Sequence, residues 1–438
     1  MSLAPPAKLR RLQEALYTKA KPEPADRCYL RYDTGHRADL LAHAYARSKQ
    51  HNGAPGGDGG PFADIEAAGV EPWSRLGGMQ EALRMETYRP QPVRRAPRGY
   101  PIPKPGGIGE RPLGIPTLRD RVGQTAAVLI LPPLVDADLE PTAREAVQAG
   151  PRALCAGHTE GMDAARSRYG DTLPHAALMQ SLARRLSDRR MLRLLKGWLN
   201  APVAEPGPGG GGRVTGGKRA TCGTPQGGVV SPLLATLYLN RSRKVVRLRG
   251  LDRRYGARLV TYADDLVGLC RHGAPGVLAQ TRQGFTQMGL TLNEQKSRVV
   301  NGRTEPFTFL GYPFGPLRYR KDGHGSLGAA PAQKAVQRVQ GRIRGLLRPG
   351  TQAPWAEGVL TLNSVLRGWA HYFSYGTRLL AYRAVDNYVA DRVRHFPRRR
   401  HKVPSRGTKR FPAEQVFGDL GVFQLRRFHL GSPAHARV

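Results

Sequence analysis

The feature that most constrains the fold of this chain is a pair of adjacent aspartates, Asp264 and Asp265, inside an apolar stretch. The residues before the pair (258–262) and after it (266–270) are mostly apolar or β-branched, which predicts two strands joined by a tight turn. Adjacent carboxylates repel each other, so a folded chain must expose them to water or offset their charge with cations. The turn is therefore either simply solvated or a site for hard divalent cations, as in phosphoryl transfer assisted by two metal ions.

The chain also carries a large excess of positive charge. Its 438 residues include 69 Lys and Arg against 33 Asp and Glu, which gives a net charge of +36. This excess is greater than solubility requires and indicates a polyanionic partner, with nucleic acid favoured over an acidic membrane surface. The longest apolar run, Ala126–Leu131, is too short to span a bilayer, and the first residues lack the apolar core of a signal peptide.

The cysteine pattern bears on the cellular compartment. The four cysteines are scattered and form no Cys-x-x-Cys pair: Cys28, Cys155, Cys222 and Cys270. This spacing argues against a zinc site or a disulfide framework and fits a reducing cytosol, so a cytoplasmic location is expected. The length of the chain predicts two or three domains.

Several stretches have recognisable local patterns. Residues 94–116 predict a basic β-hairpin that carries Lys104 and Arg111, which would either clamp phosphates or be solvated. Thr117 is expected to cap a helix over 118–131. Helices are also expected at 175–199 and 277–288, and a glycine-rich turn at 223–232 precedes another from 233. Segment 136–175 is expected to be irregular and 206–217 to be a glycine-rich loop, and 313–331 is a stretch rich in proline and glycine.

The last third of the chain predicts a group of basic helices. Apolar residues recur at helical spacing within 332–346, 359–373 and 379–396, and arginines, tyrosines and a tryptophan lie between them. Basic helices with interleaved aromatic residues suit contact with an RNA backbone and stacking on bases. The alternative is a helical bundle whose basic face is only solvated.

Eight short motifs occur in one order along the chain. They are Gly53-Ala54-Pro55-Gly56 with Asp58, Ile102-Pro103-Lys104-Pro105, Arg111-Pro112-Leu113-Gly114-Ile115-Pro116 with Arg119-Asp120-Arg121, Gly223-Thr224-Pro225-Gln226-Gly227, Tyr262-Ala263-Asp264-Asp265, Leu290-Thr291-Leu292-Asn293 with Lys296, Phe309-Leu310-Gly311-Tyr312, and Leu366-Arg367-Gly368-Trp369 with Tyr372-Phe373. Each motif alone is weak, but the ordered set on a basic chain resembles the bacterial group II intron-encoded reverse transcriptases with a maturase domain.

The resemblance implies an α+β fold of the right-hand polymerase type, with an antiparallel sheet in fingers and palm and an α-helical thumb/maturase (X) domain after them. The N-terminal extension and fingers would cover 1–130, the palm with its Tyr-Ala-Asp-Asp turn 131–320, and the thumb/maturase domain 330–400. A basic tail without an endonuclease domain is expected over 401–438.

The resemblance also implies roles for individual residues. Asp264 and Asp265 would be the catalytic residues and bind Mg²⁺, and Lys104 and Arg111 would bind the incoming nucleotide. The primer–template would be contacted by Gln226, Gly227 and Lys296. RNA binding is expected from Arg338, Arg342, Arg367, Trp369, Arg398, Arg399 and Arg400. The implied partners are group II intron RNA, a DNA target or primer, and dNTPs.

The chain departs from this family at the strand expected to carry a third acid. The matching position holds Ala165, and Gly170 replaces an aromatic residue near the sugar 2′ position. Asp163 would share a strand face with Ala165 but lie about 6.6 Å away, too far to replace the missing ligand. Gly57 and Gly123, within an otherwise helical run, are expected to cost about 1 kcal/mol each.

Two functions therefore stay open from the sequence. The chain is either a reverse transcriptase that also assists splicing, or an RNA-binding, maturase-like remnant with impaired or absent catalysis. A ribosomal-type basic protein is disfavoured by the ordered motifs.

Overall fold

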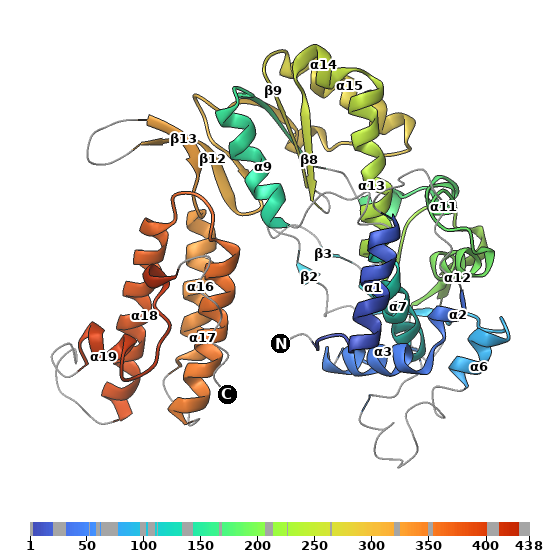
Figure 1. Cartoon of the computed structure of the whole chain (residues 1–438), viewed down its shortest axis with the longest axis horizontal. Coiled ribbons are helices and arrows are strands. Elements are labelled where there is room, and N and C mark those ends of the chain that lie inside the picture. Colours follow the sequence, from blue (N-terminus) through green and yellow to red (C-terminus); the bar gives the residue numbers. More distant parts are fainter. Residues whose placement is uncertain are drawn as a thin grey trace.

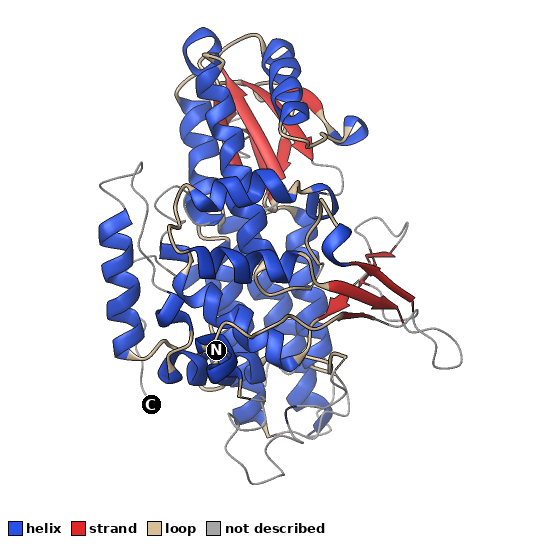
Figure 2. Ribbon diagram, turned by 90° about the vertical axis from the view of Figure 1, so that its right-hand side faces the viewer, coloured by secondary structure: helices blue, strands red, loops and turns tan. Residues whose placement is uncertain are grey.

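The computed structural model describes residues 3–20, 32–51, 53–57, 62, 78–96, 102–103, 110–111, 113–133, 143–165, 169–205, 213–225, 227–262, 265–318, 325–348, 354–400 and 411–428. An N-terminal helical region and a C-terminal helical region lie on opposite sides below a region that contains the central sheet (Figure 1). Helices account for most of the described chain, and the sheets are small (Figure 2).

The N-terminal region is built on a nearly buried helix, α7. Its helices are α1 (Ala7–Ala20), α2 (Tyr32–Gly35), α3 (Ala38–Gln50), α6 (Met79–Arg84) and α7 (Leu118–Ile130). The expected cap is confirmed, because the Thr117 side chain accepts a hydrogen bond from the Asp120 backbone N–H. The glycine at position 123 has a packing reason. A Cβ there would lie 2.9 Å from Met79 Cε and 3.2 Å from Trp198. The close packing of α7 therefore favours a glycine, because a Cβ would displace the Met79 methyl and press on Trp198.

A small mixed sheet lies beside these helices, with the strand order β4-β1-β6-β7. Its strands are β1 (Val93–Arg95), β4 (Gly114–Ile115), β6 (Pro202–Glu205) and β7 (Arg213–Gly216). The expected basic hairpin is present as β2 (Ile102–Pro103) and β3 (Glu110–Arg111), which pair antiparallel. The expectation of a glycine-rich loop over 206–217 was wrong for β7, because pairing with β6 orders these residues; residues 206–212 lie outside the description.

The central sheet is antiparallel, with the order β10-β5-β9-β8. Its strands are β5 (Glu160–Ala165), β8 (Arg258–Tyr262), β9 (Asp265–Cys270) and β10 (Arg298–Asn301). One face packs on α13 (Ser231–Leu248) and α15 (Ala274–Gln287), and the other on α9 (Ala143–Cys155). Helix α9 corrects the expectation that 136–175 is irregular, whereas β5 is the strand that the resemblance implies before the helix at 175. Smaller elements nearby are α10 (Tyr169–Thr172), α11 (His175–Ala183), α12 (Arg189–Leu199), α14 (Leu251–Tyr255), η1 (Gly217–Arg219) and η2 (Glu294–Lys296).

A third sheet connects the central sheet to the C-terminal helices. It consists of β11 (Phe307–Phe309), β12 (Tyr312–Arg318) and β13 (Gly325–Ala329), so strands form within the stretch 313–331, although its prolines and glycines locally favour turns. Burial explains the difference, because Phe314 is fully enclosed and stacks on Phe307 at 5.4 Å between ring centroids. The C-terminal region contains α16 (Gln333–Leu346), α17 (Trp355–Tyr372), α18 (Leu379–Arg400), α19 (Ala413–Phe417) and η3 (Leu425–Arg427).

The expected α+β class with antiparallel sheets is thus confirmed. The helices expected after residue 332 are also present. The segment expected to be a basic tail, 401–438, is folded in part, since residues 411–428 pack on the C-terminal helices.

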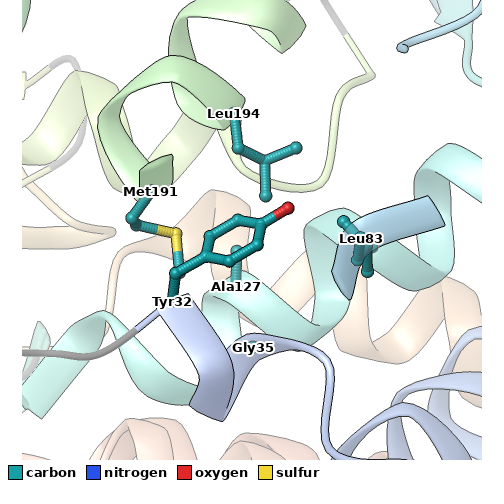
Figure 3. A pocket seen from close by; sticks show the side chains of 7 residues that line it. Tyr32, Gly35, Leu83, Ala127, Met191 and Leu194 are labelled. Atoms are coloured by element: carbon teal, nitrogen blue, oxygen red, sulfur yellow. The ribbon is translucent and has the colours of Figure 1, made fainter. Parts of the chain in front are cut away.

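The N-terminal core contains a small apolar cavity of about 10 Å³. It is lined by Tyr32, Gly35, Leu83, Gly123, Ala127, Met191 and Leu194, several of which surround the Tyr32 ring (Figure 3). Such a volume holds at most about one water molecule, and a water needs polar partners that this lining barely supplies. The cavity is therefore a packing gap and no ligand site.

Candidate active site

The aspartate pair lies where the sequence predicts it, between two paired strands. Tyr262, the last residue of β8, is directly opposite Asp265, the first residue of β9. The two predicted strands and their pairing are therefore confirmed, and Asp265 is exposed at the strand end. The two turn residues, Ala263 and Asp264, are outside the described part of the chain.

Strand β5 is the neighbour of β9 on its other side. Ala165 pairs with Asp265 in this register, and Asp163 pairs with Val267. Because side chains alternate along a strand, Asp163, opposite Val267, shares the sheet face of Asp265 but lies two residues farther from the strand end. The position opposite Asp265 therefore has no carboxylate.

Asp163 is electrostatically linked to the exposed end of β9. Burial is the main cause that raises the pKa of the Asp163 carboxyl, and the nearby charge of Asp265 raises it further. Arg298, its direct partner on β10, opposes this shift. Two carboxylates and one guanidinium thus share this face.

The family resemblance implies a hard divalent cation, and the carboxylates at this sheet edge are its candidate ligands. Carboxylate oxygens are the ligands that Mg²⁺ prefers. Among the described residues, no group of three or more His, Cys, Asp and Glu side chains is arranged to hold a metal ion. Asp265 places one carboxylate at the end of β9, whereas Ala165, opposite it on β5, supplies none.

A tyrosine from the C-terminal helices also reaches this site. The Tyr372 hydroxyl at the end of α17 donates to the carbonyl oxygen of Leu310 at 3.0 Å, and the Tyr312 hydroxyl donates to the carbonyl oxygen of Tyr372 at 2.7 Å. Burial, followed by the charges of Tyr262 and Asp265, raises the pKa of Tyr372. The sequence does not connect Tyr372 with the aspartates, because no local spacing relates segments so far apart.

The Tyr372 hydrogen bond holds an unusual turn. Leu310 and Gly311 join β11 to β12 with φ angles of 51° and 79°. The left-handed region is uncommon for a leucine, so surrounding contacts must maintain it. Besides the Tyr372 bond, the Gly311 carbonyl accepts from the Ala332 backbone N–H at 2.9 Å.

The glycine-rich loop before α13 packs closely against β4. Gly227 has a φ of 104°, and a Cβ there would come within 2.1 Å of the Gly114 carbonyl oxygen. The Thr224 backbone N–H donates to the Gly170 carbonyl at 2.7 Å. The loop, Asp171 and strands β1, β4, β6 and β7 border an open cavity of about 290 Å³. A Cβ on Gly170 would have Thr224 Oγ1 as its nearest neighbour at 3.8 Å, so this position leaves space.

The remaining expected nucleotide and primer–template residues are described only in part. Lys104 and Gln226 lie outside the described residues. Arg111 is placed by its backbone in β3 and Lys296 by its backbone in η2.

The expected RNA-binding residues differ in their exposure and in how far the structure describes them. Arg338 and Arg342 are exposed one turn apart on α16, and Arg367 is exposed on α17. Trp369 differs, because it packs on Phe373 at 4.8 Å between ring centroids and its indole nitrogen is buried; its visible role is packing. The backbones of Arg398, Arg399 and Arg400 end α18.

Taken together, these elements define a nucleic-acid polymerase core followed by a helical domain. The sequence profile described as "Reverse transcriptase (RNA-dependent DNA polymerase)" matches residues 102–314. The profile "Group II intron, maturase-specific domain" matches residues 336–411. The chain belongs to the family of group II intron-encoded reverse transcriptases with a maturase domain.

Two relatives share part of this chain. Protein YkfC of Escherichia coli (strain K12) is 32% identical over 260 residues, which covers 55% of this chain and 63% of that protein. The group II intron-encoded protein LtrA of Lactococcus lactis subsp. cremoris is 31% identical over 180 residues, 38% of this chain and 27% of LtrA. The chain thus matches less than two thirds of the length of either relative.

The length and apolar character of the helices can be compared with what a membrane span requires. Within the described ranges, no helix is long and apolar enough to cross a bilayer.

Proposed function

We propose that this chain is an RNA-directed DNA polymerase that also binds group II intron RNA and assists its splicing. The observation that carries the proposal is the exposed Asp265 at the start of β9, paired with Tyr262 at the end of β8, within the segment that matches reverse transcriptases. A helical region that matches the maturase-specific domain follows it. In this proposal residues 1–130 are the N-terminal extension and fingers, 131–320 the palm and 330–400 the thumb and maturase domain, in a cytoplasmic protein.

The proposed chemistry is addition of a nucleotide to a primer 3′ end. Asp264 and Asp265 would hold Mg²⁺, which when bound stabilises the charge that develops on the phosphoryl oxygens. Lys104 and Arg111 would bind the phosphates of the incoming dNTP, and Gln226, Gly227 and Lys296 would contact the primer–template. Exposure of Asp265 at the end of β9 supports this assignment, because the reacting groups must reach its carboxylate.

Primer extension on an RNA template tests the polymerase. The purified chain should extend an annealed DNA primer with Mg²⁺ or Mn²⁺, and Asp264→Asn and Asp265→Asn should each abolish extension. We expect a loss of at least about 100-fold, because even outer-shell partners of a metal cost about 10- to 100-fold when removed. Extension that survives both substitutions would place the catalytic centre elsewhere.

A second candidate function is RNA binding and splicing assistance without DNA synthesis. The observation that favours it is the register of β5, which puts Ala165 opposite Asp265. Binding of intron RNA without primer extension would select this candidate. Ala165→Asp would then be expected to create or increase extension, with Ala165→Asn as the control that adds similar bulk without charge.

A further inference from the structure

The C-terminal segment 411–428, which we call the C-terminal strap, is anchored to both α17 and α18. On α17, the Asn363 side chain donates to the Gly421 carbonyl at 2.8 Å and accepts from the Phe423 backbone N–H at 2.7 Å. On α18, the buried Asp386 carboxylate accepts from the Leu425 backbone N–H at 2.8 Å. All but the first residue of the strap lies beyond the segment that matches the maturase-specific domain.

The strap extends one face of α17. Asn363, Arg367 and His371 are four residues apart and therefore lie on the same side of the helix. The Arg367 guanidinium carbon lies 5.3 Å from the centre of the Phe423 ring. The His371 and Phe428 rings meet edge to face, with 4.7 Å between centroids. Helix and strap thus form one surface from segments distant in sequence.

This surface combines cations with aromatic rings. Arg367, Arg426 and Arg427 are exposed. Arg426 already forms a salt bridge within the chain, because its Nε lies 3.1 Å from the Asp386 carboxylate. Among the described residues, no carboxylate forms a salt bridge with Arg367 or Arg427. The Arg367 guanidinium thus lies over Phe423 without a carboxylate partner in the described part of the chain, and the exposed Arg427 directly precedes Phe428.

We propose that this surface, formed by Arg367, His371, Phe423, Arg427 and Phe428, binds single-stranded RNA. Guanidinium groups bind phosphates and, like aromatic rings, present flat faces on which unpaired bases stack. A duplex keeps its bases stacked internally and would use only the cations. The net charge of +36 favours a nucleic acid over an acidic peptide. The inference rests on the proposed RNA binding and adds the site and the form of RNA.

Fluorescence anisotropy with the full chain tests the proposal. The probe is a labelled oligouridine of about 20 nucleotides, titrated at several KCl concentrations, because removal of one phosphate-binding cation should reduce the slope of log K against log salt by about 0.7. Arg367→Ala and Arg427→Ala should each show this change. Phe428→Ala should raise Kd about fivefold or more, because the ring is no longer there for a base to stack on. Arg367→Gln, which keeps much of the side-chain stem, and melting curves check that folding is intact.

The chain offers a matched control in Arg254. Its guanidinium carbon lies 5.2 Å from the centre of the Tyr255 ring, a similar stacking arrangement, but on α14 beside the central sheet (Figure 1). Arg254→Ala should leave oligouridine binding nearly unchanged. Equal losses at Arg254 and Arg367 would refute the proposed surface, as would wild-type chain that does not bind oligouridine.

A second probe tests the preference for unpaired RNA. Phe428→Ala should weaken binding of a duplex RNA of the same length much less than binding of oligouridine. Equal weakening of both would overturn the single-strand assignment. These outcomes are independent of primer extension, so failure of the polymerase proposal can be told apart from failure of this one.

Discussion

Replacing Asp386 by alanine should release the C-terminal strap without unfolding the rest of the chain. The Asp386 side chain is fully buried on α18. Its carboxylate accepts from the backbone N–H groups of Leu425 at 2.8 Å and Arg426 at 3.1 Å, and from Arg426 Nε at 3.1 Å. Alanine would leave these donors without their acceptor.

The magnitude follows from those donors. A buried donor that loses its partner costs about 1–3 kcal/mol. The Leu425 amide is buried and the Arg426 amide partly so, which gives about 2–4 kcal/mol for the Asp386→Ala variant. Because about 1.4 kcal/mol corresponds to a factor of ten, hydrogen exchange of strap amides should accelerate roughly 30- to 1,000-fold.

Hydrogen exchange followed by mass spectrometry measures this effect in peptides from 411–428 and, for comparison, from α7. Asp391→Ala is the matched control, since Asp391 is on the same helix but 66% exposed, and among the described residues its one ion pair is with Arg394. It should change stability by less than about 0.5 kcal/mol. Unchanged exchange in the Asp386→Ala strap, or equal acceleration in α7, would refute the reasoning.

Three further changes have defined outcomes. Gly227→Ala should lower the free energy of unfolding by at least about 2 kcal/mol in urea titrations, because the positive φ and the Gly114 carbonyl exclude a Cβ. Gly35→Ala should raise it by about 0.5–1 kcal/mol, because the added methyl would line the apolar cavity at 3.4 Å from Met191 without a strained φ. Asp163→Asn should raise the melting temperature at pH 7, because a carboxyl whose pKa is raised by folding opposes folding when it is ionised. This gain should vanish below about pH 4, where the carboxyl is protonated in the folded and the unfolded chain.

Local patterns were enough to predict some elements of this fold. The paired strands around the Asp264–Asp265 turn follow from apolar residues on both sides of two acids. The cap at Thr117 and the helices after residue 332 follow from residue type and periodicity over one or a few turns. These signals are local, because a turn, a cap or an amphipathic face is defined by residues near each other in sequence.

Other elements were not predictable because distant partners stabilise them. Strand β12 contains Pro313, Gly315 and Pro316, which locally favour irregular structure, yet it pairs with β11 on one side and β13 on the other. The strap folds because Asn363 and Asp386 satisfy its backbone groups. In both cases the hydrogen bonds that compensate unfavourable local sequence come from other segments.

The sequence by itself determined the family and the chemistry of the candidate site, because ordered motifs and an adjacent acidic pair are written in residue order. Only the tertiary structure decided which residues surround that pair. Strand pairing set Ala165 opposite Asp265 and placed Asp163 two residues farther along the strand. The docking of α17 brought the Tyr372 hydroxyl to the Leu310 carbonyl, where burial and, in addition, the charge of Asp265 raise its pKa. Register and docking are fixed by side-chain burial across strands and helices, and residue order alone does not specify these contacts.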